Sequence, residues 1–452
     1  MLEIERSITK TLKDWAKRDQ RKVLLLRGAR QVGKTFVCRQ LGRTFKSFVE
    51  VNLVEQPLIT RLFEDQALSI DQLISSIAAL AGKRIIDGET LLFIDEIQAS
   101  KEAIERLRFF YERRPNLHVI ATGSLLEFAL EEVGSFGVGR IENLFMHPLT
   151  FEEVLLANGE AQLLELIRSM TLKDPLPKPL HEKALNLLRQ YLIVGGLPEA
   201  QAQFIATKDL LILDRLSSDL LTTYEDDFAK YHKKVPAIRL RDTLRAVAFQ
   251  SGKKFIYSHA YRDAVSKEVH SALDLLSRAG LAHKIHHTAA SGVPLGAQID
   301  PKKFKVIPHD IGLFNQLAGL KLAELLTAGE IHLINKGALV EVFVGLELLA
   351  HGVGENDHRH TRNSLFYWHR EAKSSNAELD YVLEIGREII PLEVKASGTG
   401  AMRSMRVFLK EKEIKMGIRV SAEPLAKLED TLVLPLYALS EVTRLWLSGF
   451  AK

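Results

Sequence analysis

The chain has 452 residues, of which 46% are hydrophobic and 26% are charged, and its formal net charge is +4. This length exceeds what one hydrophobic core organises, so we expect a globular protein of two to four domains. The small positive charge favours polyanionic partners only weakly, because a change of a few lysines would remove it. The single cysteine, Cys38, excludes an internal disulfide and predicts a small buried residue in a reducing compartment.

The N-terminal segment, residues 1–22, is charged throughout and lacks the apolar core of a signal peptide. No apolar run along the chain approaches the roughly 18 residues that span a bilayer. The sequence therefore predicts a cytoplasmic protein that does not enter a membrane.

The first chemical motif follows a short aliphatic run at Val23–Leu26, which is typical of a strand buried on both faces. The pattern G-x-x-x-x-G-K-[ST] comes next, and the apolar residues after it predict a helix. Backbone N–H groups of such a loop surround phosphate oxygens, and the helix N-terminus adds a favourable dipole. Lys34 would reach the β and γ phosphates and Thr35 would ligate magnesium, whereas a chance match in a turn is the alternative. The expected nucleotide-binding residues are Gly28, Ala29, Arg30, Gln31, Val32, Gly33, Lys34, Thr35 and Phe36.

A second strand-like run, Thr90–Gln98, contains the adjacent carboxylates Asp95 and Glu96. Burying two like charges at a strand end is costly unless a cation or a reacting water uses them. In a nucleotide site Asp95 would hold magnesium through its bound water, and Glu96 would orient and deprotonate the attacking water. A solvated helix start is the alternative. Together with the glycine-rich loop, this run predicts ATP hydrolysis and not binding alone.

Two further runs, Ser47–Leu53 and Leu117–Ser124, fit the same sheet. The second one ends in polar residues, of which Thr122 and Ser124 are candidates to contact the γ-phosphate or the attacking water. Arg140 precedes a last strand-like segment. It either reaches into a neighbouring subunit's site, where it would stabilise transition-state charge, or forms a surface salt bridge.

The middle of the chain is mostly helical in pattern. Leucines recur through Glu152–Met170, and the proline-rich stretch Asp174–Pro179 predicts a lid or hairpin boundary. Two more helical segments are separated by a turn at Gly195–Pro198. The consecutive acids of the second segment, Glu225–Asp227, are expected to face solvent, as carboxylate runs on helices usually do.

A change of pattern follows, with basic residues and then two short helix candidates, Ser258–Val265 and Ser266–Leu281. Ser266 can cap the second candidate, and Gly280 breaks it before a strand-like run. An apolar stripe on this candidate predicts a face turned to a core, formed by Val269, Leu273 and Leu276.

Helix, turn, helix and β-hairpin is the winged-helix order, in which the second helix enters a major groove. Lys267 and His270 would then meet bases or phosphates. Nearby phosphates would be contacted by Lys253, Lys254 and Arg262. Winged helices also serve as protein-packing modules. The neighbouring acids Asp263 and Glu268 count against DNA binding, because they would repel phosphates.

The C-terminal third contains a second constellation of charged residues. An amphipathic helix start offers Glu341, and two or three strands follow within residues 363–397. Asp380 lies on one strand, and Glu393 and Lys395 lie two apart on the next, so they project from the same face. A PD-(D/E)XK site uses this arrangement to bind one or two magnesium ions and to activate water for phosphodiester cleavage. The expected metal ligands are Asp380 and Glu393, with Lys395 polarising the water or the phosphate and Glu341 as an accessory acid; simple charge alternation along a half-exposed strand is the alternative.

Several of these stretches resemble the AAA+-type ATPases that are widespread in bacteria and archaea and are generally catalogued only as ATP-binding proteins. The resemblance covers nearly the whole chain and implies an ATPase domain, a winged-helix region and a C-terminal fold similar to PD-(D/E)XK nucleases. Its motifs are LLLRGARQVGKTF, FIDEIQ, ATGS, the Gly139–Arg140 pair, PLTFEE, GGLPEA, GALVE and ELDYVLEIGREIIPLEVKAS.

The sequence thus predicts an α/β protein in three parts. These are an AAA+-like P-loop ATPase domain with a parallel sheet (1–170), a helical and winged-helix domain (171–330) and a mixed α/β PD-(D/E)XK nuclease-like domain (331–452). ATP and Mg²⁺ are the expected cofactors, and the leading hypothesis couples ATP hydrolysis to binding, remodelling, branch migration or cleavage of duplex or branched DNA. The alternative is a nucleotide-driven switch or assembly factor that binds a protein partner through an inactive nuclease-like domain. The resemblance to AAA+ proteins also implies a homo-oligomeric ring.

Overall fold

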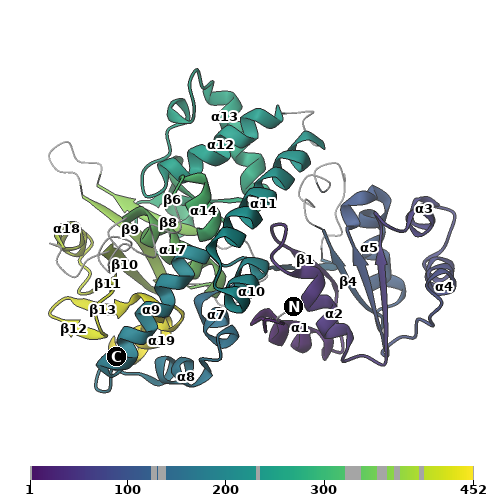
Figure 1. Cartoon of the computed structure of the whole chain (residues 1–452), viewed down its shortest axis with the longest axis horizontal. Helices are drawn as coiled ribbons and strands as arrows, with labels where there is room; N and C mark the ends of the chain where they lie inside the picture. Colours follow the sequence, from purple (N-terminus) through teal and green to yellow (C-terminus); the bar gives the residue numbers. More distant parts are fainter. Residues whose placement is uncertain are drawn as a thin grey trace.

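The structure is a computed structural model that describes residues 3–123, 130, 139–230, 235–320, 337–353, 364–370, 377–395 and 402–450. Ser124, a predicted phosphate contact, lies outside the described residues. Figure 1 shows two sheets at opposite ends of the molecule, with helices α10 (Pro198–Thr207) and α11 (Leu210–Lys230) drawn between them. The protein is α/β, as predicted. None of its described helices is both long and apolar enough to cross a lipid bilayer.

The first sheet has five parallel strands in the order β2-β3-β4-β1-β5. The predicted strands of the N-terminal region are confirmed as β1 (Val23–Arg27), β2 (Ser47–Asn52), β3 (Thr90–Asp95), β4 (His118–Thr122) and β5 (Ile141–Phe145). Because β4 lies between β1 and β3, its last residue stands between the glycine-rich loop and the end of β3. The carboxyl ends of parallel strands form the usual binding edge of an open α/β sheet.

Helices cover both faces of this sheet, so its central strands are apolar on both sides. On β1, Leu24 and Leu26 belong to the core shared with α1 and α2, whereas Val23 and Leu25 pack with α3, α4 and α5. Cys38 on α2 is fully buried, as predicted. The bounds of the helical elements are α1 (Ile8–Ala16), α2 (Lys34–Gly42), α3 (Pro57–Glu64), α4 (Ile70–Ala81), η1 (Ile97–Ala99) and α5 (Lys101–Arg113).

The helical middle differs from its predicted pattern at three points. The leucine-rich segment is two helices because the chain turns at Gly159, where φ is 78°. Residues 258–265 contain only part of the 3-10 turn η2, and the helix that precedes α13 is α12. Ser266 is the first residue of α13 and makes no capping bond, because Val265 occupies the cap position. The bounds are α7 (Phe151–Ala157), α8 (Ala161–Ser169), α9 (Lys178–Val194), α12 (Ala237–Gln250), η2 (Tyr257–His259), α13 (Ser266–Arg278) and α14 (Ile311–Leu317).

The second sheet is mixed and has eight strands in the order β12-β13-β11-β10-β9-β8-β6-β7. The β6–β7 hairpin follows α13, as predicted, and β6 pairs in parallel with β8. The expected domain boundary at residues 330 and 331 therefore falls between strands of one sheet. The bounds are β6 (Ala282–Thr288), β7 (Ile299–Pro308), β8 (Leu365–His369), β9 (Glu378–Ile385), β10 (Glu388–Lys395), β11 (Gly417–Ser421), β12 (Ala426–Leu428) and β13 (Thr431–Pro435).

Helix α17 (Gly337–His351) is buried on nearly every side and contacts β7, β8 and β10. The sequence predicts an amphipathic helix here, and this prediction is wrong because every residue from Leu339 to Gly345 is buried. The remaining elements are η3 (Leu295–Gln298), α18 (Arg403–Glu411), η4 (Leu436–Glu441) and α19 (Val442–Phe450).

A close backbone contact explains the glycine pair between α9 and α10. A Cβ on Gly195 would lie 2.5 Å from the backbone nitrogen of Gly312, and one on Gly196 would lie 2.5 Å from the oxygen of Leu149. Asp310 accepts a hydrogen bond of 2.7 Å from the Gly196 N–H. Only glycine fits at this joint, which holds the end of α9 against the start of α14.

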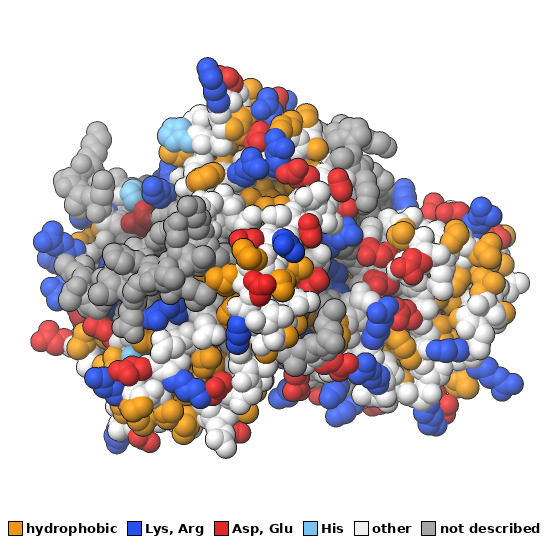
Figure 2. Space-filling view, in the orientation of Figure 1, with side chains coloured by type: hydrophobic (Ala, Val, Ile, Leu, Met, Phe, Trp, Pro, Cys, Tyr) orange, Lys and Arg blue, Asp and Glu red, His pale blue; other side chains and the backbone are white. Residues whose placement is uncertain are grey.

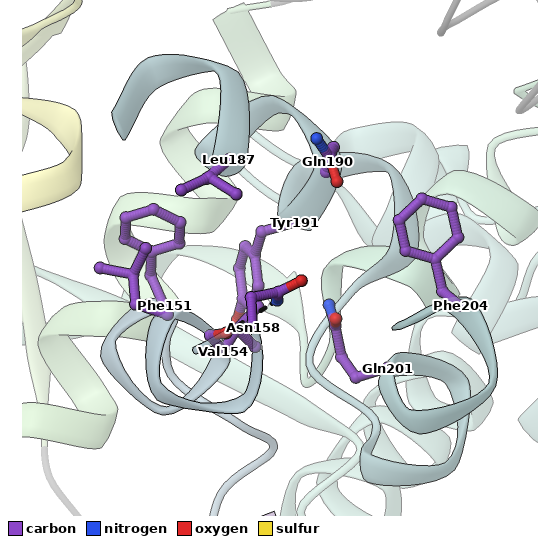
Figure 3. A pocket seen from close by; sticks show the side chains of 9 residues that line it. Phe151, Val154, Asn158, Leu187, Gln190, Tyr191, Gln201 and Phe204 are labelled. Carbon is purple, nitrogen blue, oxygen red and sulfur yellow. Dashed lines mark hydrogen bonds between the residues drawn. The ribbon is translucent and has the colours of Figure 1, made fainter. Parts of the chain in front are cut away.

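Beside this joint, α7, α9 and α10 leave a small hollow (Figure 3). Phe151, Tyr191 and Gln201 lie on its walls, and the Tyr191 hydroxyl donates to the oxygen of Leu149 over 2.7 Å. Its volume of about 10 Å³ matches roughly one water molecule. The hollow is therefore far too small for a nucleotide.

Candidate nucleotide site and C-terminal carboxylate cluster

The loop between β1 and α2 follows a path that requires glycine at its start. Gly28 has φ 144°, and a Cβ there would lie 2.3 Å from the oxygen of Met146. Gln31 and Gly33 also have positive φ, at 63° and 97°. The loop runs directly into the N-terminus of α2, where backbone N–H groups have no partner within the helix. This arrangement favours an anion at the loop.

Lys34, the first residue of α2, is buried beneath the loop. Its Nζ donates hydrogen bonds to the oxygens of Gly28 and Ala29, at 2.9 and 2.7 Å. Burial lowers the pKa of Lys34 to about 8, although the nearby carboxylates of Glu96 and Asp95 act in the opposite direction. Both hydrogen-bond acceptors are neutral carbonyls, so the positive charge remains available for a phosphate.

Asp95, at the end of β3, lies between two of the other predicted site residues. Thr35 donates its hydroxyl to Asp95 Oδ2 over 2.8 Å, and the Thr122 hydroxyl donates to Oδ1. The backbone N–H of Glu96 also donates to Oδ1, at 2.9 Å. Three elements, α2, β3 and β4, thus bring a carboxylate and two hydroxyls together. Oxygen ligands of this kind suit Mg²⁺, and Thr35 and Asp95 are the residues that would hold it.

Glu96 has an unusual backbone conformation for a residue with a side chain. Its φ of 52° lies in the left-handed region, which costs energy and is concentrated at functional sites. Gln98 donates a hydrogen bond from Nε2 to Glu96 Oε2 and so orients the carboxylate. No local pattern distinguishes Gln98, and the sequence prediction missed it.

Arg140 lies on the surface just before β5. Its Nε donates to Glu112 Oε1 on α5 over 2.8 Å, and its side chain is 49% exposed. Within this chain Arg140 therefore forms the surface salt bridge that was one of its two predicted states. A role in the site of a neighbouring subunit stays a prediction.

The comparisons agree with this geometry. A family model described as an AAA domain matches residues 20–155, a range that contains the loop, Asp95 and Thr122. The N-terminal region is a P-loop ATPase domain of the AAA type. Two models described only as domains of unknown function match residues 185–324 and 336–439. Among curated proteins, no match was found.

Solved structures were also found, at low identity and low structural similarity. The Walker-type ATPase PABY2304 of Pyrococcus abyssi is 15% identical, with 70% of this chain and 96% of that chain covered and a TM-score of 0.46. The ORC1 protein of Aeropyrum pernix, solved in complex with DNA, is 14% identical, with 71% and 92% covered and a TM-score of 0.28. Cdc6p of Pyrobaculum aerophilum is also 14% identical over the same shares, with a TM-score of 0.23. All three TM-scores are below 0.5.

Arg6 ties the ATPase loop to other elements and has no sequence signal of its own. Its Nη1 donates to the oxygen of Val32 over 2.5 Å, and its Nη2 donates to the oxygen of His147 over 2.7 Å. Its Nε lies 3.2 Å from Glu153 Oε1 on α7. Burial opposes ionisation of Glu153, but Arg6 and two backbone N–H groups lower its pKa below the usual value. A buried ion pair thus joins the loop, the exit of β5 and α7.

A second ion pair joins the loop to α11. Arg30 Nη1 lies 2.5 Å from Asp227 Oδ2, and the Asp227 side chain is 4% exposed. The expectation that this acidic run faces solvent is wrong for Asp227, whereas Asp226 is exposed. A signal was present, because Leu220, Tyr224 and Asp227 are spaced i, i+4, i+7 and all are buried. The prediction treated the three consecutive acids as one exposed group and did not consider this helical spacing.

In the C-terminal part, a lysine from β7 reaches the predicted carboxylates. Lys305 Nζ lies 2.9 Å from Glu341 Oε1 on α17 and 2.5 Å from Glu378 Oε1 on β9. It also lies 4.0 Å from Asp380 Oδ1. Burial lowers the pKa of Lys305, but these carboxylates outweigh burial and raise it above the usual value. Neither Lys305 nor Glu378 was singled out from the sequence, since each occurs in an ordinary strand pattern.

The predicted pair on β10 is formed as expected. Lys395 Nζ lies 2.5 Å from Glu393 Oε1, because the two side chains share one face of the strand. Asp380 Oδ2 accepts the Val394 N–H over 2.7 Å, which places the three predicted strand residues side by side. Burial raises the pKa of Asp380 and of Glu393, and it raises the pKa of Glu341 to about 7.

The predicted metal centre contains lysine side chains as well as carboxylates. Among the described residues, no group of three or more His, Cys, Asp or Glu side chains is placed to hold a metal ion. The predicted ligands Glu341, Asp380 and Glu393 are brought into one region, but lysine ammonium groups lie among them. The residues expected to form a magnesium site thus form a cluster of ion pairs in this structure, and the metal site itself stays a prediction.

Proposed function

We propose that this protein hydrolyses ATP with the help of magnesium at the edge of the first sheet. The observation that carries the proposal is the cluster of Thr35, Asp95 and Thr122 beside the loop that Lys34 spans. The groups that donate to the Asp95 carboxylate are two hydroxyls and a backbone N–H, which are oxygen and nitrogen donors without charge, so a cation can still bind there. The loop and Lys34 supply the complementary positive environment for a triphosphate.

Each residue has a role that its position supports. The loop N–H groups and Lys34 bind the phosphates, and Thr122 fixes the orientation of the Asp95 carboxylate. Glu96 accepts the proton of the attacking water, with Gln98 holding its side chain. Thr35 and Asp95 would hold magnesium, which would supply positive charge to neutralise the charge that develops on the phosphates. The test is steady-state ATP hydrolysis by the full chain, with the variants described in the Discussion.

We further propose that ATP turnover is coupled to DNA, through the end of the molecule formed by α12 and α13. Figure 2 shows Lys and Arg side chains over these helices, interspersed with acidic and apolar ones. All five side chains predicted to contact DNA are exposed: Lys253, Lys254, Arg262, Lys267 and His270. Glu268 lies 3.3 Å from Arg239, so one of the two acids that count against DNA binding is engaged with a neighbouring arginine.

The DNA proposal is tested by binding and by ATPase rate. Duplex, single-stranded and branched DNA are compared at low salt, where phosphate contacts are strongest. The Lys254→Ala/Lys267→Ala variant should bind every DNA more weakly, with the slope of log K against log salt reduced by about 1 per lost phosphate contact. Lys178→Ala is the control, because this lysine is 85% exposed on α9. An absence of DNA binding at low salt would remove the proposal.

A second candidate function is a nucleotide-driven switch or assembly factor that binds a protein partner. It is favoured by the ion pairs that fill the C-terminal cluster, since they oppose cleavage chemistry there. A stable partner recovered by pull-down, together with an ATPase rate that DNA does not change, would select this function. For both candidate functions we propose that the chain assembles into a homo-oligomeric ring. Gel filtration of wild type and Arg140→Ala in the presence of ATP tests whether Arg140 contributes to this assembly.

A further inference from the structure

The C-terminal cluster is assembled from elements that are distant in the sequence. Lys305 is on β7, Glu341 is on α17, and Glu378 and Asp380 are on β9. The Lys305 side chain is 1% exposed, and its Nζ also lies 5.3 Å from the centre of the Tyr367 ring on β8. The ammonium is therefore enclosed by carboxylates and an aromatic face, which both attract a cation.

We propose that Lys305 is a built-in cation that takes the place a metal ion would have in this carboxylate cluster. Buried carboxylates need a positive partner, because an isolated buried charge is very costly. Lys305 supplies that charge at hydrogen-bond distance to Glu341 and Glu378. The chain thereby completes the site itself, and the proposal does not depend on the ATPase or on DNA.

The position of Lys305 also explains why a divalent ion is excluded. A metal ion would need carboxylate oxygens at about 2.0–2.6 Å. Two of these oxygens already bind the ammonium, so an incoming ion would meet a like charge within a few ångströms. Lys395 occupies Glu393 Oε1 in the same way. Within this group, Glu393 Oε2 is the buried carboxylate oxygen that lacks a hydrogen-bond partner. If a metal ion does bind this cluster, we therefore expect Glu393 to be one of its ligands.

The cluster joins parts of the fold as well as charges. β7 is an edge strand of the second sheet, and Lys305 links it to α17 and to the start of β9. The hairpin that follows α13 is in this way fastened to the carboxylates of the C-terminal strands. Loss of the ammonium should leave buried like charges and loosen this junction.

The experiment measures Mn²⁺ binding by electron paramagnetic resonance, using the nucleotide-free full chain in an Asp95→Asn background. This background removes Asp95, the carboxylate assigned to the metal ion of the ATPase site, so that bound Mn²⁺ reports on the C-terminal cluster. We expect no bound Mn²⁺, and we expect the same Tm in Mn²⁺ and in EDTA. Micromolar Mn²⁺ binding that is lost in Glu393→Gln or Asp380→Asn would overturn the proposal. Cleavage of duplex, single-stranded or branched DNA by wild type with Mg²⁺ or Mn²⁺, abolished in Lys395→Ala, would overturn it too.

The matching variant, in the same background, is Lys305→Met, which keeps the apolar stem and removes the charge. Its Tm should fall by at least about 5 °C, and Mn²⁺ or the additional change Glu341→Gln should restore part of the loss. Lys302→Met is the control, because this lysine is exposed on the same strand. An unchanged Tm in Lys305→Met contradicts the proposal. If this variant does not fold, Lys305→Arg, which keeps the positive charge, should fold with a near-normal Tm. The Mn²⁺ measurement on the chain with Lys305 unchanged then tests whether a metal ion binds the cluster.

Discussion

At the end of β3, Asp95 is held by two hydroxyls and an N–H, whereas at the start of β9 the carboxylates of Glu378 and Asp380 face the ammonium of Lys305. The ATPase site also contains a buried lysine, but Lys34 donates to carbonyl oxygens and not to Asp95. Two regions of one chain thus combine acids with a buried lysine in opposite ways.

The pKa directions follow from this difference. Burial dominates for Lys34 and lowers its pKa to about 8, while surrounding carboxylates raise the pKa of Lys305. A site that keeps its positive and negative groups apart is prepared for a ligand that carries both a metal ion and phosphates. A site that pairs them has its charges satisfied internally. Residue types alone do not distinguish these cases, because geometry decides which groups meet.

The largest expected effect is on ATP binding. Lys34→Ala removes the buried ammonium, and the affinity for ATP should fall by about 100-fold or more, or roughly 3 kcal/mol. Equilibrium binding of a fluorescent ATP analogue measures it, with circular dichroism to show that the variant is folded. Binding equal to wild type would mean that Lys34 does not contact the phosphates and that the contrast with Lys305 has no functional meaning.

The next effect separates binding from chemistry. Glu96→Gln keeps the shape of the side chain but cannot accept a proton, so kcat should fall by about 100- to 10,000-fold while ATP still binds. Phosphate release and ATP binding are measured on the same preparation. Glu64→Gln, at an exposed acid on α3, serves as the control and should hydrolyse ATP normally. Unchanged hydrolysis in Glu96→Gln would remove Glu96 from its assigned role.

A pH titration sharpens the contrast between the two lysines. The pKa of Lys34 is about 8 in the free protein, and bound phosphates should raise it, so binding above that pH must take up a proton. ATP affinity should be flat below about pH 7 and fall by up to tenfold per unit above pH 8. Calorimetric Kd values from pH 6.5 to 9.5 test this, and a constant Kd across the range would contradict it. The Lys305 cluster should not lose its ammonium in this range.

The smallest expected effect concerns the contact between the loop and α11. Asp227→Asn removes the partner of Arg30, so the loop must be ordered on binding and KM for ATP should rise about three- to tenfold with little change in kcat. Asp226→Asn changes the neighbouring exposed acid and should leave both constants unchanged. Equal KM values in the two variants would show that the Arg30–Asp227 pair does not position the loop.

Much of the ATPase site was predictable because its signals are local. A buried strand, a glycine-rich loop and a helix follow one another within residues 23–42, and the acids of the second motif end another buried strand. Short-range hydrogen bonding and hydrophobic periodicity leave such segments few alternatives. The approach of Thr35 and Thr122 to Asp95 then follows from the parallel sheet.

The long-range partners of these sites were not predictable in the same way. Arg6, Asp227 and Lys305 reach residues 26, 197 and 36 positions away, and no pattern within their own segments records the partner. Asp227 shows the difficulty. Its helical spacing indicates burial, but only the packing of α11 against the loop brings Arg30 close enough to stabilise the buried carboxylate.

The amino-acid sequence by itself determined the strands of the first sheet, the α/β class and the phosphate-binding loop, because each depends on neighbours along the chain. Only the tertiary structure decided which acids meet neutral donors and which are paired with a lysine. The physical reason is that the energy of a buried charge depends on the groups within a few ångströms of it, and folding brings those groups from remote segments.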